Sequence, residues 1–359
     1  MKVLHYVDAE SISWSLPYIE HIKSLEKFGI EQALLCRPGG DIERGARENG
    51  IPVFTWKPLM SGMPLLSPGF VKLIREIGPD IIHTRLSSAA GIAGFWRKHH
   101  GVPVVSTFDK PAKAKYYTRS SRCISCAEWL KDYMVNTQGM DPAMIDVVHN
   151  PVNAARFSRD MAVRNDFRKS LGLSESDILF SGMGIYIKSK GFDILIKAFA
   201  QVCREYDGQE TLRLALIGAE GEKGMRESYK RLADELGVSV IMPDSFVHDV
   251  RAWLWASDIF VMPSREEGFS IALLEGLSSG LPAVVSDIEP FTEIIRTERN
   301  NGLIAKKDDP ESFALAMLKI LRAGREGRAC ISANSLAVMK YFSPENAAEK
   351  TIAVYERVL

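Results

Sequence analysis

The sequence predicts an α/β protein made of two doubly wound domains, each built on a parallel β-sheet. Short apolar strands alternate with helical segments from the N-terminus onward. The alternation stops at a polar stretch, residues 156–177, and then starts again. Strands joined by helical crossovers form parallel sheets that are covered on both faces. The length of 359 residues also suits about two domains.

The first half of the chain supplies the first run of strands and helices. Residues 3–7 are a short apolar run, typical of a buried strand, and residues 17–28 have the periodicity of an amphipathic helix. The same two patterns recur along this half. The further predicted strands are 30–35, 80–83 and 103–107, and the further predicted helices are 68–77 and 88–97.

The second half begins with strand 178–180, which leads into a glycine-rich loop from Gly182 to Gly191. Ligands of such sheets bind at the carboxyl ends of the strands, so we expect the site in a cleft between the two domains. The alternation after this loop is regular. It predicts helices 192–203, 223–236, 250–256 and 270–279, and strands 212–217, 239–241, 258–262 and 282–286.

The composition excludes several classes of protein. The 45 basic residues balance 45 acidic ones, so no overall field attracts nucleic acid. Five scattered cysteines exclude a disulfide scaffold and suit a reducing compartment. The N-terminal segment lacks the layout of a signal peptide, and no run of about eighteen apolar residues exists. We therefore expect a cytoplasmic protein, either free or peripheral on the cytoplasmic face of a membrane.

The densest group of candidate functional residues follows strand 258–262. Glu267 and Gly268 lie in the loop, and Glu275 lies about one and a half turns into the next helix. Two carboxylates placed in this way can accept hydrogen bonds from vicinal hydroxyls of a sugar or ribose, and the free NH groups at the helix start favour a phosphate. The alternative interpretation is an ordinary strand–turn–helix with solvated acids, since charged residues are mostly exposed.

The run E-G-F-x4-L-E at residues 267–275, followed by G-L-P-A-V-V-S at 280–286, resembles the E-x7-E region of family 4 retaining glycosyltransferases. Those enzymes have the GT-B fold, with two Rossmann-like domains and a donor nucleotide sugar bound mainly to the second. The resemblance implies that Glu267 contacts the donor sugar or diphosphate and that Glu275 contacts the ribose hydroxyls. The further diphosphate ligands that it implies are main-chain NH groups near Gly268, Phe269 and Ser270.

The resemblance extends over most of the chain. Residues 190–199 are similar to the family's K-G-x-D-x-L-I-x-A-F, and residues 79–83 to its P-D-I-I-H. In this register Lys190 is expected to bind the diphosphate and to stabilise the leaving group, a role that needs no metal. We therefore expect no metal and no cofactor besides the donor. The alternative is an ordinary surface lysine.

The first departure from the family lies in the glycine-rich loop. The family usually has an arginine directly after the glycine that precedes the lysine by six residues. Here Gly184 is followed by Ile185, so a second phosphate cation is missing. Lys188 projects from the same loop and is the candidate replacement; otherwise the diphosphate is held less tightly.

Two further departures lie in the first half. After strand 103–107 the family often has a histidine near the reacting centre, where this chain has Asp109. Asp109 either hydrogen-bonds sugar hydroxyls and offsets charge on the anomeric carbon, or merely caps its loop. The first βα loop, residues 8–14, lacks the family's paired glycines, which leaves its contact with acceptor or donor open.

A basic segment, residues 97–122, carries seven Lys and Arg residues against one aspartate. It fits anionic lipid headgroups or a phosphorylated acceptor, and the apolar stretch 59–66 would insert at a membrane interface beside it. The alternative is a solvated basic face with a buried loop. Cys123 and Cys126 form a lone C-x2-C without two further ligands, so packing is a better interpretation than zinc binding.

These observations predict an acceptor-binding domain over residues 1–160, a donor-binding domain over 161–341, and a C-terminal helix within 342–359 that crosses back to the first domain. The resemblance implies transfer of a hexose-type sugar from a nucleotide diphosphate sugar to a hydroxyl of a glycan or lipid-linked saccharide, with retention, in cell-envelope polysaccharide or lipopolysaccharide synthesis. The residues that we expect to take part in catalysis are Lys190 and Glu267, which the resemblance implies, and Asp109, which replaces the family's histidine.

Two alternatives stay open: a nucleotide-sugar epimerase of the same fold, and a sugar-nucleotide-binding protein without catalysis. A nicotinamide oxidoreductase is disfavoured, because the glycine-rich loop after strand 178–180 lacks a third glycine at the right offset.

Overall fold

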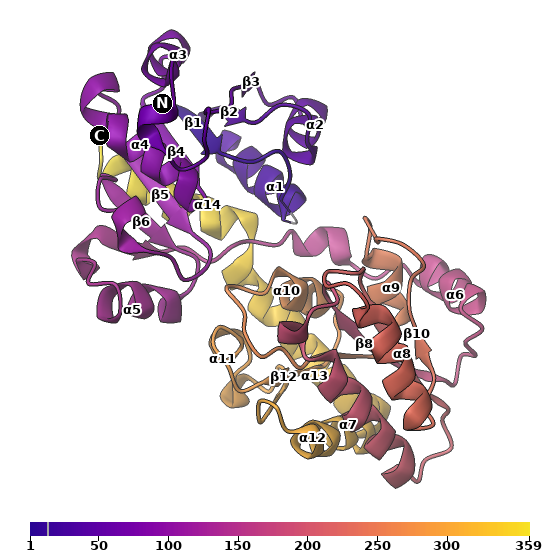
Figure 1. The fold of residues 1–359 in the computed structure, drawn as a ribbon. Helices are drawn as coiled ribbons and strands as arrows, with labels where there is room; N and C mark the ends of the chain where they lie inside the picture. The colour runs from indigo at the N-terminus through magenta and orange to yellow at the C-terminus, as the bar shows by residue number, and fades with distance from the viewer. Residues whose placement is uncertain (13) are drawn as a thin grey trace. The chain divides into compact units, whose positions relative to one another are not determined.

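The computed structural model describes residues 1–12 and 14–359, Thr297 without its side chain. The chain divides into two compact units (Figure 1). Unit 1 comprises residues 1–153 and 342–359, and unit 2 comprises residues 154–341. Each unit is an α/β domain on a parallel sheet, which confirms the predicted fold class.

Unit 1 contains a seven-stranded sheet in the order β3-β2-β1-β4-β5-β6-β7, with every neighbouring pair parallel. Its strands are β1 (Lys2–Val7), β2 (Glu31–Cys36), β3 (Val53–Thr55), β4 (Ile81–Arg85), β5 (Val104–Phe108), β6 (Arg122–Ser125) and β7 (Ile145–Val147). Its α-helices are α1 (Ser15–Glu26), α2 (Asp41–Glu48), α3 (Phe70–Ile77), α4 (Ser87–His100), α5 (Glu128–Asn136) and α14 (Pro344–Glu356), and its 3₁₀ turns include η1 (Pro64–Leu66), η2 (Ala114–Tyr116) and η3 (Pro142–Met144).

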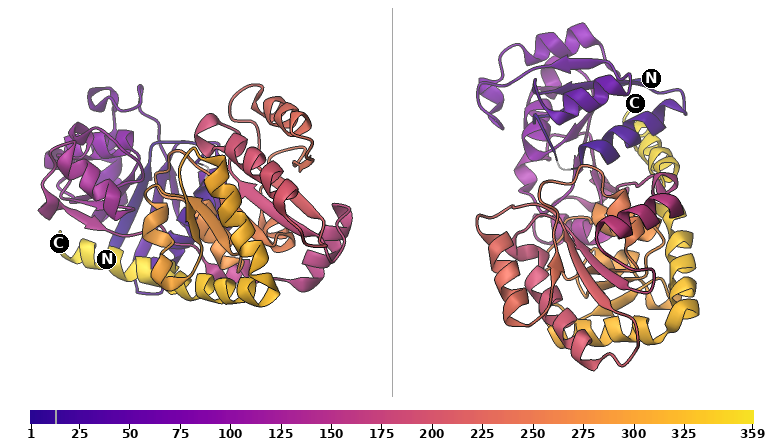
Figure 2. Two further views of the ribbon diagram at one scale, coloured as in Figure 1. Left: turned by 90° about the horizontal axis from the view of Figure 1, so that it is seen from below. Right: turned by 90° about the vertical axis from the view of Figure 1, so that its right-hand side faces the viewer.

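Apolar side chains of the unit 1 strands pack in one core on one face of the sheet and in two clusters on the other face. Leu4 and Tyr6 of β1 pack in the core that contains Phe70 of α3. Val3 and Val7 alternate with them and point to the opposite face, as the two-residue period of a strand requires. Helices cover both faces, and Figure 2 shows the yellow C-terminal helix α14 beside the indigo N-terminal elements of this unit.

Helix α14 is held on unit 1 by polar as well as apolar contacts. Lys27 Nζ of α1 donates to Glu345 Oε1 at 2.7 Å, and Tyr355 OH lies 2.6 Å from His83 Nδ1 of β4. Tyr355 is fully buried. The end of the chain is therefore part of the core of unit 1.

Unit 2 contains a six-stranded parallel sheet in the order β10-β9-β8-β11-β12-β13. Its strands are β8 (Ile178–Met183), β9 (Leu212–Ile217), β10 (Val240–Ile241), β11 (Ile259–Met262), β12 (Ala283–Ser286) and β13 (Leu303–Ala305). Its α-helices are α6 (Met161–Ser170), α7 (Phe192–Glu205), α8 (Met225–Glu235), α9 (Arg251–Ala256), α10 (Ile271–Ser278), α11 (Phe291–Ile294), α12 (Pro310–Arg322) and α13 (Gly324–Val338), with the 3₁₀ turn η5 (Lys188–Lys190).

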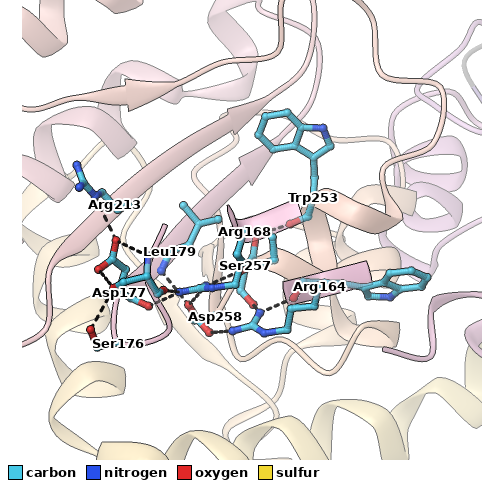
Figure 3. Close-up of polar contacts among 12 residues, drawn as sticks. Arg164, Arg168, Ser176, Asp177, Leu179, Arg213, Trp253, Ser257 and Asp258 are labelled. Atoms are coloured by element: carbon cyan, nitrogen blue, oxygen red, sulfur yellow. Dashed lines mark hydrogen bonds and ion pairs between the residues drawn. The ribbon is translucent and has the colours of Figure 1, made fainter. Parts of the chain in front are cut away.

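The polar stretch 156–177 is not merely a bridge, because it contains helix α6, whose Arg164 and Arg168 are shown with Asp258 in Figure 3. Arg164 Nη2 donates to Asp258 Oδ1 at 2.7 Å, and Arg168 Nη1 donates to Asp258 Oδ2 at 3.0 Å. Asp258 immediately precedes β11 and also accepts from the amide of Leu179 in β8 at 2.9 Å. Two arginines one turn apart, both paired with Asp258, therefore hold α6 on the amino ends of β8 and β11, together with Phe167, which packs against Trp253 of α9.

The two sheets have the same topology. From β1 in unit 1, and from β8 in unit 2, the next strands along the chain are added on one side, and the strands from β4 or β11 onward are added on the other side. The switch point lies between β1 and β4 in unit 1 and between β8 and β11 in unit 2. Loops diverge at the carboxyl ends of these two strands, and open α/β sheets bind their ligands there. Among the described residues, no helix is long and apolar enough to cross a membrane.

Candidate functional site

The loops that follow β8 and β11 meet at the switch point of unit 2. The amide of Arg265 donates to Ser189 O at 2.7 Å. Gly191 has φ +69°, and a Cβ added to it would lie 2.0 Å from Pro263 O. Only glycine permits both this backbone conformation and this approach. The glycine of the predicted K-G-x-D pattern therefore serves to close the two loops on each other.

Lys190 and Glu267 form the centre of this junction. Lys190 Nζ donates to Glu267 Oε1 at 2.7 Å, and Ser264 Oγ donates to the same oxygen at 2.9 Å. The side chains of Lys190 and Glu267 are 20% and 8% exposed. A Cβ on Gly184 would lie 3.3 Å from Lys190 Cδ and Cε, so the stem of the lysine crosses that glycine. The structure thus brings three of the predicted site residues into contact.

Arg265 and Asp193 brace the same loops, and the sequence patterns did not single them out. Arg265 donates through Nη1 and Nη2 to the two carboxylate oxygens of Asp193 at 2.9 Å each. Its Nη1 also donates to Lys188 O at 2.6 Å. The hydrogen bonds to Asp193 raise the pKa of Arg265 above its usual range. Asp193 lies within the K-G-x-D pattern that resembles the family, and Arg265 lies two residues before Glu267, so these positions are the signal that could have pointed to them.

Lys188, the predicted replacement for the missing arginine, contributes its carbonyl oxygen to this brace, while its side chain is exposed. Ile185, at the position of the arginine, is 43% exposed. The loop therefore presents one half-buried cation, Lys190, and one exposed cation, Lys188.

Helix α10 begins directly after the Glu267 loop. Ser270 is its N-cap, and Ser270 Oγ accepts from the amide of Leu273 at 3.3 Å. The first amides of a helix have no acceptor within the helix, and they carry the positive end of its dipole. Phe269 is buried, and Glu275 is half-buried on α10, eight residues after Glu267. Helix starts favour anions, and Lys190 contacts Glu267, three residues before the N-cap Ser270.

Asp109 belongs to unit 1, where it lies just beyond the carboxyl end of β5. Its Oδ1 accepts from Arg85 Nη1 at 2.5 Å and from Asn150 Nδ2 at 3.0 Å. Arg85 ends β4, the strand at the switch point of unit 1, and its side chain is 6% exposed. Burial alone would lower the pKa of Arg85, but the charge of Asp109 raises it.

The first βα loop and the helix after it pack on the same arginine. The Arg85 guanidinium lies 5.3 Å from the ring centre of Trp14 and 5.2 Å from that of Tyr18, distances at which cation–π attraction acts. Asp8 in the same loop accepts from Arg37 Nε at 2.8 Å. Ser13, also in this predicted loop, lies outside the described residues.

Three buried histidines, His5, His21 and His83, lie in the interior of unit 1. Burial lowers the pKa of His5 to about 4 and that of His21 to about 3, and it holds the pKa of His83 well below its usual range. The positive charge of Arg85 also lowers the pKa of each of these three histidines. These imidazoles are therefore neutral at pH 7.

Metal ligands do not cluster in the described part of the chain: no group of three or more His, Cys, Asp or Glu side chains is placed to hold an ion. Cys123 and Cys126 are buried free thiols. Burial raises the pKa of Cys123 to about 12.

Comparison with known families gives two matches that follow one another along the chain. Residues 19–156 match Glycosyltransferase Family 4, and residues 175–323 match Glycosyl transferases group 1. The two matched ranges together span most of the sequence.

Three curated relatives have related descriptions. The D-inositol 3-phosphate glycosyltransferase of Nocardioides sp. (strain ATCC BAA-499 / JS614) is 24% identical over 311 residues, covering 77% of this chain and 67% of the relative. The lipopolysaccharide core biosynthesis glycosyltransferase LpsE of Rhizobium meliloti is 26% identical over 337 residues, 89% of each chain. The UDP-Gal:alpha-D-GlcNAc-diphosphoundecaprenol alpha-1,3-galactosyltransferase of Escherichia coli is 25% identical over 317 residues, covering 82% and 80%.

Solved structures agree with the fold over the full length. A glycosyltransferase from Rickettsia africae superimposes with a TM-score of 0.88 at 17% identity, covering 99% of this chain and 98% of that one. Anabaena HepE in complex with UDP gives a TM-score of 0.85 at 17% identity and full coverage of both chains. The chain therefore belongs to the family-4-like glycosyltransferases of GT-B fold.

Proposed function

We propose that this glycosyltransferase moves a hexose from a nucleoside diphosphate sugar to a hydroxyl of a glycan or lipid-linked saccharide, with retention of the anomeric configuration, in the synthesis of lipopolysaccharide or another cell-envelope polysaccharide. The observation that carries the proposal is the contact between Lys190 and Glu267 at the switch point of unit 2. The lysine would bind the negatively charged diphosphate of the donor, and the carboxylate beside it would accept hydrogen bonds from the hydroxyls of the linked sugar.

In this proposal unit 2 binds the donor. The diphosphate lies between Lys190 and the amides at the start of α10, which stabilise the negative charge of the leaving group as the glycosidic bond breaks. Glu267 accepts from sugar hydroxyls, and Glu275 accepts from the ribose hydroxyls. Lys190 and the start of α10 supply the positive charge that stabilises the leaving diphosphate, so we propose that no metal takes part. That HepE was solved with UDP supports a uridine nucleotide as the first candidate.

Unit 1 binds the acceptor in this proposal, with Asp109 oriented by Arg85 and Asn150 toward sugar hydroxyls. The names of two relatives, one of lipopolysaccharide core biosynthesis and one that uses a diphosphoundecaprenol substrate, support a glycan or lipid-linked acceptor. We also propose that the protein works at the cytoplasmic face of a membrane.

The test is thermal stabilisation by a panel of UDP-, GDP- and ADP-sugars, followed by transfer to saccharide acceptors with the best donor. A ligand stabilises in proportion to its affinity and concentration, so the best donor gives the largest shift. Glu275→Ala should abolish that shift, and proton NMR of the product should show the anomeric configuration of the donor. An unchanged shift in the variant would overturn the role of Glu275.

The same assay separates the two alternatives. Conversion of the nucleotide sugar to its epimer without an acceptor would identify an epimerase. Tight donor binding with no transfer to any acceptor would identify a binding protein. Activity that is lost in EDTA and restored by a divalent cation would overturn the metal-free mechanism.

A further inference from the structure

One loop of unit 1 exposes an unusual number of large apolar side chains. Single exposed apolar residues are ordinary, whereas clustered ones mark interaction sites. In residues 59–66, here called the apolar loop, the exposed fractions are 76% for Leu59, 54% for Met60, 48% for Met63, 78% for Leu65 and 37% for Leu66. The sequence had left open whether this stretch is buried, and the structure places it at the surface.

The apolar loop is held in its exposed position by hydrogen bonds. The amide of Leu59 donates to Leu66 O at 2.8 Å, which closes the two ends of the loop on each other. Trp96 Nε1 of helix α4 donates to Pro64 O at 3.0 Å, and Ser61 Oγ donates to Asp8 Oδ2 at 2.7 Å. The loop is therefore pinned to the body of unit 1 through its polar groups, which leaves its apolar side chains in solvent.

Helix α4 also supports the basic segment. A Cβ on Gly91 would lie 3.3 Å from Tyr116, and one on Gly94 would lie 3.1 Å from Arg119 Cβ, so residues 113–119 pack directly on α4. The Arg119 guanidinium lies 4.9 Å from the ring centre of Phe95. The apolar loop and residues 113–119 thus share one supporting helix. Tyr117 is buried with its hydroxyl 3.1 Å from Ser87 Oγ, so it does not join the surface.

The charge around the apolar loop is mostly positive. Residues 57–76 and 97–119 contain nine Lys and Arg residues and two acids, Glu76 and Asp109, a formal net charge of nine minus two, or +7. Asp109 is itself paired with Arg85. The basic residues are Lys57, Lys72, Arg75, Arg97, Lys98, Lys110, Lys113, Lys115 and Arg119.

A groove of about 760 Å³ adjoins the apolar loop between α3 and α4. Leu65 and Trp96 line it together with the cations Lys72 and Arg75 and the acid Glu76, whose Oε1 lies 3.7 Å from Lys72 Nζ. Arg75 Nη2 donates to His99 O at 2.7 Å, which ties α3 to α4. The groove therefore places cations directly beside apolar walls.

We propose that the apolar loop, with the basic residues of α3, α4 and 113–119 around it, docks unit 1 on an anionic lipid bilayer. Leu59 and Leu65 insert among the acyl chains at the interface, and the lysines and arginines bind the headgroup phosphates. A bilayer offers apolar depth and anionic charge side by side, which this surface matches. The proposal extends the membrane location given under Proposed function, but membrane binding is measured without donor or acceptor, so its failure is distinct from failure of the catalytic assignment.

The test is co-sedimentation of the full chain with vesicles of phosphatidylcholine alone and of phosphatidylcholine mixed in equal parts with phosphatidylglycerol. We expect binding to the anionic vesicles that weakens as salt is raised. The double variant Leu59→Ser/Leu65→Ser should bind at least tenfold more weakly, and Lys113→Glu/Lys115→Glu should lose the preference for phosphatidylglycerol. Thermal unfolding and nucleotide binding of each variant confirm that its fold is intact.

The matched control lies on helix α12 of unit 2, where Leu315 is 57% exposed and Lys319 is exposed. Leu315→Ser and Lys319→Glu should leave vesicle binding unchanged. The proposal is overturned if the wild type ignores anionic vesicles, or if the unit 1 variants bind them as the wild type does. It is also overturned if Leu59→Ser/Leu65→Ser only converts a dimer of the free protein to a monomer, since the apolar loop would then bind a second copy of the chain.

Discussion

Lys190 and Glu267 lie 77 residues apart in the sequence, and yet Nζ and Oε1 of these side chains are 2.7 Å apart. They come from the loops after β8 and β11, the two strands at which the sheet of unit 2 reverses its order. The lysine proposed to bind the donor diphosphate is thus already oriented by a carboxylate before a donor arrives. Donor binding must therefore share or replace this ion pair, so its strength affects donor affinity.

Replacing Lys190 should weaken nucleotide binding selectively. Charge-assisted hydrogen bonds contribute about 1.5–3 kcal/mol, so Lys190→Met should raise the Kd of the preferred nucleoside diphosphate by about 10- to 100-fold. Isothermal titration calorimetry measures this change. Lys188→Met is the matched control, because its side chain is exposed while its carbonyl oxygen holds Arg265. An equal loss in both variants would mean that Lys188 does supply the second phosphate cation.

Removing Asp109 should destabilise unit 1 more than removing Asn150. Arg85 is 6% exposed, and Asp109→Ala would leave its charge buried without a counterion, at a cost of about 3 kcal/mol in the free energy of unfolding. Asn150→Ala leaves the ion pair in place and should cost about 1 kcal/mol. Urea unfolding measures both.

The control for the Asp109 variant is Glu76→Ala, which breaks the Lys72–Glu76 pair whose side chains are 82% and 60% exposed. It should change stability by less than about 0.5 kcal/mol. Asp109 would be of no structural importance if its loss cost as little as the loss of Glu76.

The sequence predicts those elements that are held by apolar packing, and it misses those that are held mainly by charged side chains. Strands such as β4 and β5 are buried along their whole length, so their apolar runs were visible in the sequence. Helix α6 was missed, because Arg164 and Arg168, which bind Asp258 and carbonyl oxygens, hold most of its inward face. Phe167 packs on Trp253 between them, but one aromatic residue among arginines does not form an apolar stripe.

The candidate site shows the same limit. Glu267 and Lys190 were each identified from local motifs, but their contact depends on Gly191 bringing two distant loops together. The brace of Arg265 on Asp193 joins residues 72 apart, and no local pattern reports such a pair. Local motifs therefore pointed to Lys190 and Glu267 one at a time, whereas the contact between them and the brace of Arg265 on Asp193 required the fold.

Acid should destabilise unit 1 through its buried histidines. The pKa of His21 is about 3 in the folded chain and about 6.5 when unfolded. Between these values the unfolded state binds more protons, so stability is full above pH 6.5 and falls as the pH drops below it. Lowering the pH from 7.5 to 5.5 should cost about 1 kcal/mol for each such histidine. Urea unfolding followed by tryptophan fluorescence at the two pH values measures the loss.

His21→Leu isolates one of these contributions. His21 Nδ1 is buried without a hydrogen-bond partner among the described residues, and Nε2 lies 3.5 Å from Thr351 Oγ1. The variant should be at least as stable as the wild type at pH 7.5 and should lose about 1 kcal/mol less at pH 5.5. His248→Gln, at an exposed position, should leave the pH dependence unchanged. A full acid loss in His21→Leu would exclude His21 as a cause.

Breaking the arginine pair of α6 should destabilise unit 2. Arg168 Nη1 donates to Ala256 O and Asp258, and Nη2 donates to Ser174 O and Asp177 O (Figure 3). Arg168→Met leaves these buried acceptors unpaired and should lower the free energy of unfolding by about 3 kcal/mol. Arg213→Met is the control, since Arg213 lies 3.6 Å from Asp177 and its side chain is 41% exposed. It should cost less than about 1 kcal/mol, and a similar cost for both variants would contradict a special role for Arg168.

The contact of Gly191 with the loop after β11 predicts a difference between two glycines of unit 2 that share one φ angle. Gly172 and Gly191 both have φ +69°, but a Cβ on Gly172 meets nothing within 4 Å, whereas one on Gly191 would lie 2.0 Å from Pro263 O. Alanine at either position incurs the cost of the left-handed conformation, about 1 kcal/mol. Only Gly191→Ala also forces the two loops apart, which separates Lys190 from Glu267. We therefore expect Gly172→Ala to lower stability by about 1 kcal/mol with unchanged nucleotide affinity, and Gly191→Ala to lower nucleotide affinity at least tenfold. Urea unfolding and calorimetric titration of the two variants decide the matter: equal nucleotide affinities would show that donor binding does not depend on the contact between these loops.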